Sequence, residues 1–179
     1  MPVAVSTMAH FARLMGCIEE QARIDTRASL LHVHFRRYVA AYARQHYETA
    51  AMYGRRMAES FCIIALPDNH EAKEYGSLCE MAWALPCWEL KVYDYIQEYT
   101  DLVEIANELC MGIGYANVWN DLTTVRWYGN DGCHVSAKQL DQGPLEAKEE
   151  AFVSTIRVGI ATLALLRKKP QGYLKGAKL

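Results

Sequence analysis

The sequence predicts an all-α protein, built as a single bundle of about five to seven helices. Apolar residues recur every three or four positions through most of the 179 residues, strand-like alternation is close to absent, and the prolines fall at or outside the ends of the periodic segments. A chain of this length can bury enough apolar surface to fold without disulfides or metals. We expect one helical domain over residues 1–169 and a basic tail over residues 170–179.

The prediction is organised on one long helix over residues 25–66, which contains no proline and a single glycine. A shorter helix over residues 7–24 precedes it. Asp25 or Thr26 offers a side-chain oxygen to cap the first turn of the long helix, and Pro67 ends the long helix. The apolar stripe that should be buried consists of Ala28, Leu31, Phe35, Tyr38, Tyr42, Thr49, Tyr53, Met57, Phe61 and Ile64.

Three further helices are expected in the middle of the chain. A capping box formed by Asp68 and Glu71 starts a helix over about residues 69–85. The next helix, over residues 86–111, has an apolar stripe and an acidic outer face. After two glycines, residues 115–128 resume the helical period for about four turns.

The last third of the chain combines a turn, a connection and a final helix. Residues 129–132 read Gly-Asn-Asp-Gly and predict a turn, because these residue types tolerate positive φ. Residues 133–143 show no firm period and predict an irregular connection. The final helix, over residues 145–169, becomes apolar all round over residues 158–166, which predicts burial on every side.

Charge is unevenly distributed along the chain, although the net charge is only −2. Residues 1–66 carry 8 basic and 5 acidic side chains, residues 67–150 carry 5 and 16, and residues 151–179 carry 6 and none. Such segregation can pair the ends with the middle within one molecule or between molecules. It can also leave basic surface for an anionic partner.

Arginines alternate with tyrosines along the predicted long helix. Guanidinium groups bind phosphates and aromatic rings stack on bases, so a helix of this kind can bind RNA or single-stranded nucleic acid. The alternative is that the tyrosines lie in the core and the arginines are solvated or paired with the acidic helix. The candidate partner-binding residues are Arg36, Arg37, Arg44, Arg55, Arg56, Arg167, Lys168, Lys169 and Lys175, and the candidate acidic interface is Asp94, Glu98, Asp101 and Glu108.

No motif predicts a metal, a cofactor or a catalytic group. The six histidines lack the spacing of a helical di-iron site, and there is no Cys-x-x-Cys pair. A nucleophile elbow and a phosphate-cradling glycine loop are also absent from the sequence. The six cysteines are irregularly spaced, so we expect buried free thiols rather than disulfides.

Two short segments resemble parts of helical enzyme families. Residues 120–124, Asn-Asp-Leu-Thr-Thr, resemble the start of the magnesium-binding motif of class I terpene synthases, but Tyr128 occupies its final acidic position. Residues 85–88, Leu-Pro-Cys-Trp, are similar to a short motif of the thiaminase-II branch of the haem-oxygenase-like helical fold. The resemblances imply a small enzyme or carrier with an aromatic-lined apolar pocket. Its candidate residues are Cys87, Trp88, Trp119, Asn120 and Asp121.

We favour a non-enzymatic interaction protein over the enzyme alternative, because the sequence lacks a complete catalytic motif. Such a protein would self-associate through opposed basic and acidic faces into a homo-oligomer, as viral or phage structural and accessory proteins do, with RNA or single-stranded nucleic acid as a candidate partner. The longest weakly polar run, residues 158–166, is too short for a membrane span of roughly twenty residues, so we expect no membrane insertion. The N-terminus lacks a secretory pattern, which favours a cytoplasmic location.

Overall fold

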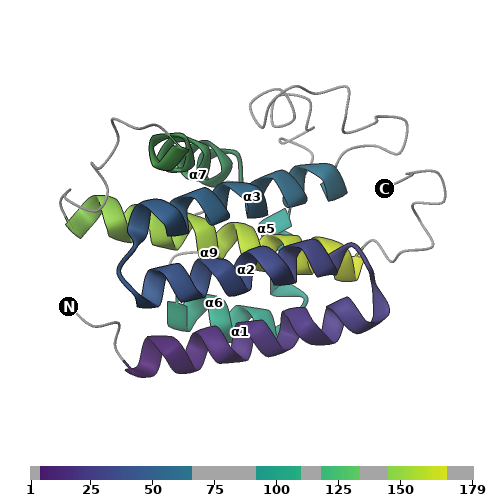
Figure 1. Ribbon diagram of the computed structural model, residues 1–179. Coiled ribbons are helices and arrows are strands. Elements are labelled where there is room, and N and C mark those ends of the chain that lie inside the picture. Colours follow the sequence, from purple (N-terminus) through teal and green to yellow (C-terminus); the bar gives the residue numbers. More distant parts are fainter. Residues whose placement is uncertain (1–4, 66–91, 110–117, 134–144, 169–179) are drawn as a thin grey trace.

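The computed structural model describes residues 5–65, 92–109, 118–133 and 145–168, and these residues form seven helices and no strand (Figure 1). The predicted all-α bundle is therefore confirmed. Its helices are α1 (Val5–Ile24), α2 (Ala28–Ala43), α3 (Tyr47–Ala65), α5 (Val92–Gln97), α6 (Thr100–Leu109), α7 (Val118–Cys133) and α9 (Leu145–Lys168).

Helix α9 lies at the centre of the bundle. It contacts each of the other described helices, with α2 and α3 in front of it and α7 above it in Figure 1. Every residue over 158–166 is buried, which confirms the burial on all sides that its apolar composition predicted. Thr162, the one hydroxyl in this stretch, donates its hydrogen to the Val158 carbonyl at 2.7 Å, so it adds no unsatisfied polar group to the core.

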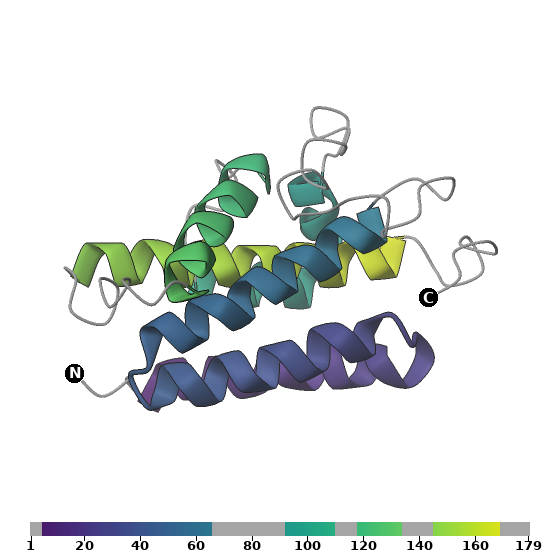
Figure 2. The same cartoon turned by 45° about the horizontal axis from the view of Figure 1, so that its top comes forward.

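The long helix predicted over residues 25–66 is wrong, because the chain reverses between α2 and α3. The backbone N–H of His46 donates to the Ala41 carbonyl at 3.0 Å, and that of Gln45 donates to the Tyr42 carbonyl at 2.9 Å. This is a Schellman motif with Gln45 in the left-handed position, at φ 62°. Glycine usually occupies that position, so the sequence carried no obvious stop signal. The bundle is consequently organised on α9, and α2 and α3 form a helical hairpin (Figure 2).

Asp25, one of the two residues predicted to cap this helix, binds the backbone just before α2, but the N-cap residue itself is Arg27, which makes no side-chain cap hydrogen bond. The Asp25 carboxylate accepts the backbone N–H of Arg27 at 3.0 Å and also the Nε–H of the same arginine at 2.9 Å. Both side chains are buried, with 3% and 6% of their surfaces exposed. This compact ion pair satisfies backbone and side-chain donors at the tight corner between α1 and α2.

The turn predicted over residues 129–132 is wrong, because α7 continues through it to Cys133. A Cβ atom on Gly129 would lie 2.5 Å from the Arg55 Cβ and 3.0 Å from the Ala51 carbonyl oxygen. Gly129 is therefore needed for close approach between α7 and α3, and not for a positive φ. Gly54 plays the same part between α3 and α9, where its Cβ would lie 2.9 Å from the Thr155 hydroxyl.

The single helix predicted over residues 86–111 is also wrong where the structure describes it. Two helices, α5 and α6, meet at Glu98 and Tyr99. The break puts Asp101 in the first turn of α6, where a negative charge is favourable, and brings the Tyr99 ring under the Arg167 guanidinium, 5.1 Å from its carbon. The break, which the apolar period did not predict, thus places Tyr99 and Asp101 beside Arg167 of α9.

The main hydrophobic core draws on all seven described helices. Phe11, Phe35 and Phe61 are among its largest fully buried side chains, and the predicted stripe of α2 is buried at Ala28 and Leu31. The predicted helix over residues 69–85, the irregular connection over residues 133–143 for all but its first residue, and the basic tail lie outside the described residues. None of the described helices is long and apolar enough to cross a membrane.

Candidate functional site

The predicted acidic interface lies on α5 and α6 and the segment that joins them, and most of it is ion-paired within the chain. We call this region the paired-charge surface. It comprises Arg13 on α1, Glu98, Asp101, Glu104 and Glu108, and Arg167 and Lys168 on α9. Asp94, the remaining predicted acidic residue, is exposed on α5.

Asp101 and Arg167 form the central pair of this surface. Both terminal guanidinium nitrogens of Arg167 donate to the Asp101 carboxylate, each at 2.8 Å, in the bidentate geometry that makes arginine–carboxylate pairs strong. Hydrogen bonding from Arg167 holds the pKa of Asp101 below its ordinary value, and the same bond raises the pKa of Arg167. Beside them, Lys168 donates to Glu98 at 2.8 Å.

The α1 side of the surface adds Arg13 and Cys17. Arg13 donates to Glu104, and a second nitrogen of its guanidinium lies 3.5 Å from Glu108. The Cys17 thiol lies 3.7 Å from the Asp101 carboxylate, and burial together with that negative charge raises its pKa. Cys17 is therefore a protonated, half-buried thiol, and Cys62 is a buried one; both are free as expected, but only Cys62 is fully buried.

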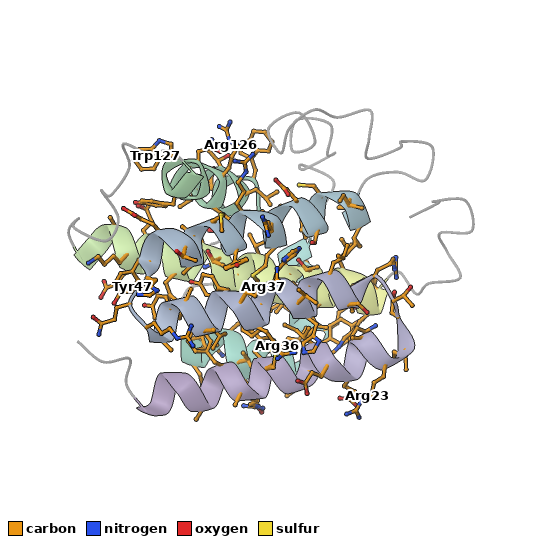
Figure 3. All side chains as sticks on the ribbon, in the orientation of Figure 1. Arg23, Arg36, Arg37, Tyr47, Arg126 and Trp127 are labelled. Carbon is orange, nitrogen blue, oxygen red and sulfur yellow. The ribbon has the colours of Figure 1, made fainter. Side chains whose placement is uncertain are left out.

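The predicted cations on α2 and α3 are distributed over several directions. Arg37 points toward α3 and Arg36 toward α1 (Figure 3). Arg44 is exposed at the C-terminal end of α2. Arg55 turns toward α7, donating to the Asn130 side chain at 2.7 Å, and its Nε lies 3.5 Å from Glu59.

Two of these predicted arginines meet where α2 and α3 lie side by side. The guanidinium carbons of Arg37 and Arg56 lie 5.8 Å and 5.6 Å from the centre of the Tyr53 ring, within cation–π range. His34, one turn before Arg37, completes what we call the arginine cluster. Both arginines are exposed, whereas His34 and Tyr53 are half-buried.

No carboxylate among the described residues lies within ion-pair distance of Arg37 or Arg56. The positive potential of the cluster is therefore not neutralised by the chain's own described acids. The pKa of His34 is lowered by burial and then by the charges of Arg56 and Arg37, which keeps its ring neutral near pH 7. The cluster combines two exposed guanidiniums, an aromatic ring and a neutral imidazole.

The predicted enzyme pocket is only partly described. Trp119 is half-buried against the core, Asn120 is exposed, and Asp121 is buried with its carboxylate 3.4 Å from Arg157. The ion pair between Asp121 and Arg157 joins α7 to α9, and this structural role explains the buried carboxylate better than magnesium binding does. Cys87 and Trp88 lie outside the described residues, as do Lys169 and Lys175.

A shallow hollow lies elsewhere, between α2, α3 and α9, near Tyr47 in Figure 3. Its volume is about 220 Å³ including the open solvent at its mouth. Tyr38, Tyr42 and Tyr47 line it, and the Lys148 ammonium lies 4.8 Å from the centre of the Tyr47 ring. Burial raises the pKa of Tyr42 to about 12, so this phenol does not act as a base. Within the described segments, no group of histidine, cysteine or acidic residues could hold a metal.

Comparisons of the chain with protein-family models, with curated proteins and with solved structures find no match. The function is therefore inferred from the geometry of the described residues.

Sequence reasoning did not single out His34 and Tyr53 as site residues. It placed Tyr53 in the apolar stripe of a continuous helix and assigned no role to His34. Once α2 and α3 form an antiparallel hairpin, Tyr53 lies beside Arg37. The available signal was local: a His and an Arg three residues apart at 34 and 37, and a Tyr and an Arg three residues apart at 53 and 56.

Proposed function

We propose that this chain is a non-enzymatic helical interaction protein that binds RNA or single-stranded nucleic acid through the exposed face of α2 and α3. One observation carries the proposal: Arg37 and Arg56 on this face have no carboxylate partner among the described residues, whereas the cations of the paired-charge surface do. Exposed arginine without an internal counter-ion favours an anionic ligand.

The chemistry of the arginine cluster suits a phosphate backbone with unstacked bases. Arg37 and Arg56 can each donate two parallel hydrogen bonds to a phosphate. Tyr53 offers an aromatic ring beside them, and aromatic rings bind bases of any sequence by stacking. We therefore expect binding with little sequence preference. Arg44 adds an exposed cation at the C-terminal end of α2, whereas Arg36 points toward α1 (Figure 3).

Self-association through opposed charged faces stays a prediction. The carboxylates that would serve it, Glu98, Asp101 and Glu108, already have cationic partners within the chain. An oligomer that used them would have to exchange those partners. Nucleic-acid binding requires no such exchange at Arg37 and Arg56.

The first test is the salt dependence of binding to a short single-stranded oligouridylate. If arginines neutralise phosphates, the logarithm of the affinity should fall linearly with the logarithm of the salt concentration. Replacing Arg37 with alanine should weaken binding and reduce that slope by about 1. No binding at low salt, or an affinity that does not respond to salt, would contradict the proposal.

Arg23→Glu provides a matched control for Arg37→Glu. Both residues are exposed arginines without a described ion pair, but Arg23 lies at the far end of α1, away from the cluster (Figure 3). Arg37→Glu should reduce affinity strongly and Arg23→Glu only slightly. Equal losses would mean that net charge, and not this face, determines binding. Sedimentation at low and high salt, with absorbance read for copurified nucleic acid, tests self-association in the same preparation.

A further inference from the structure

His34 occupies an unusual position within the arginine cluster. It is half-buried, its Nδ1 is inaccessible to solvent, and neither ring nitrogen is hydrogen-bonded to a described residue. The charged groups that act on it are Arg37 on its own helix and Arg56 on α3. From α1 and α9, which also contact α2, no described carboxylate acts on the ring.

This environment opposes a positive charge on His34. Protonation would place a half-buried positive charge on the His34 ring beside the two exposed guanidiniums, and no described acid would compensate that charge. An anion bound by Arg37 and Arg56 would reverse the balance, because it would neutralise the arginine charges and attract an imidazolium. An imidazolium carries a hydrogen on both ring nitrogens, so His34 would attract the anion by its charge and donate to it from Nε2, since Nδ1 is buried.

We infer that His34, Arg37 and Arg56 form one phosphate-binding site, in which His34 gains a proton when a backbone phosphate of the nucleic acid binds. The inference rests on the proposed function and adds its regulation by pH. Tyr53, which contacts both arginines, positions their guanidiniums at the site and offers its ring to the adjacent base.

The sign of the pH dependence follows from linkage. In the free protein the pKa of His34 is lowered, so the ring is neutral at pH 7. If phosphate raises that pKa, protons and phosphate each strengthen the binding of the other. Affinity should therefore rise as the pH falls, within the window between the pKa of the bound form and that of the free form. One linked proton limits the change to about tenfold for each pH unit.

The experiment measures oligouridylate affinity between about pH 5 and pH 8 for the wild type, His34→Gln and His46→Gln. Neither uracil nor the phosphodiester titrates in this range, so the protein is the source of any pH dependence. His46 is exposed at the junction of α2 and α3 and serves as the matched control. We expect the wild type and His46→Gln to bind more tightly at low pH, and His34→Gln to bind with no such rise.

NMR titration of the His34 ring gives an independent measurement. Its pKa should rise when oligouridylate is added, and also when sulfate is added as a small anion that does not titrate. Circular dichroism and urea unfolding should show that His34→Gln folds as the wild type does.

The outcomes separate the proton-linked site from nucleic-acid binding itself. Binding with equal pH dependence in the wild type and His34→Gln would overturn the proton-linked site and leave nucleic-acid binding intact. If oligouridylate does not bind at any pH, the proposed function fails. The NMR titration with sulfate then shows whether His34, Arg37 and Arg56 form an anion site at all. A rise in the His34 pKa with sulfate would support an anion site, and no rise would overturn it.

Discussion

The paired-charge surface and the arginine cluster use the same side chains in opposite ways. In the first, the two terminal guanidinium nitrogens of Arg167 donate hydrogen bonds to the Asp101 carboxylate, each at 2.8 Å, and the guanidinium also lies over the Tyr99 ring. In the second, Arg37 and Arg56 lie over Tyr53 and have no acidic partner among the described residues. An arginine over a tyrosine is therefore structural where a carboxylate completes it, and available to an external anion where none does.

Helix α3 links the arginine cluster to the rest of the bundle, since it carries Arg56 and Tyr53 and packs against α7 and α9. The largest expected effect comes from disturbing that helix. Gly129→Ala would force a Cβ to within 2.5 Å of the Arg55 Cβ, and we expect it to lower the free energy of unfolding by about 1–3 kcal/mol. Urea unfolding measures this change.

Gly16→Ala is the matched control for that substitution. Gly16 lies inside α1, and apart from the neighbouring backbone of α1 itself no atom lies within 4 Å of the position that its added methyl group would take. Alanine there should stabilise the protein by roughly 0.5–1 kcal/mol through helix propensity. A neutral Gly129→Ala would show that α3 and α7 can separate without cost.

The next effect tests the paired-charge surface. Asp101→Ala removes the partner of Arg167, whose side chain is 20% exposed, and should cost about 1–2 kcal/mol of unfolding free energy. Glu98→Gln weakens the more exposed pair with Lys168 and should cost no more than about 0.5 kcal/mol. If the two losses were equal in urea unfolding, the bidentate pair would have no special structural role.

The pH dependence of the free energy of unfolding gives a second test of the Asp101–Arg167 pair. Because the pKa of Asp101 is lower in the folded protein, its contribution is present above the unfolded value of about 4 and is lost as the pH falls through the folded value. The difference in unfolding free energy between the wild type and Asp101→Asn should therefore be largest near neutral pH and shrink below about pH 4. A difference that stays constant with pH would contradict the pairing.

The smallest effect on stability is expected in the arginine cluster. Arg37→Ala removes an exposed side chain without a described carboxylate partner, and should change the free energy of unfolding by less than about 0.5 kcal/mol while weakening nucleic-acid binding. Urea unfolding and the oligouridylate titration measure the two effects on one protein sample. A large loss of stability would identify the cluster as structural and remove the contrast with Asp101.

The candidate site was only partly predictable from the sequence. Arg37 and Arg56 were identified from their type and spacing, but the same reasoning grouped them with Arg167 and Lys168, which lie against carboxylates. A cation's availability depends on which acids the fold brings near it. That information is spread over helices distant in the chain and has no local sequence signal.

The sequence by itself determined the all-α class, the final helix and its burial over residues 158–166, because these follow from periodicity and composition within one segment. Tertiary structure decided where helices end and which charges meet. Gln45 adopts a left-handed conformation that glycine would have signalled, and Gly129 continues a helix where its type predicted a turn. The reversal between α2 and α3 then brought Tyr53 and Arg56 beside Arg37 and His34, because contacts between helices depend on their relative placement and not on the period of either one.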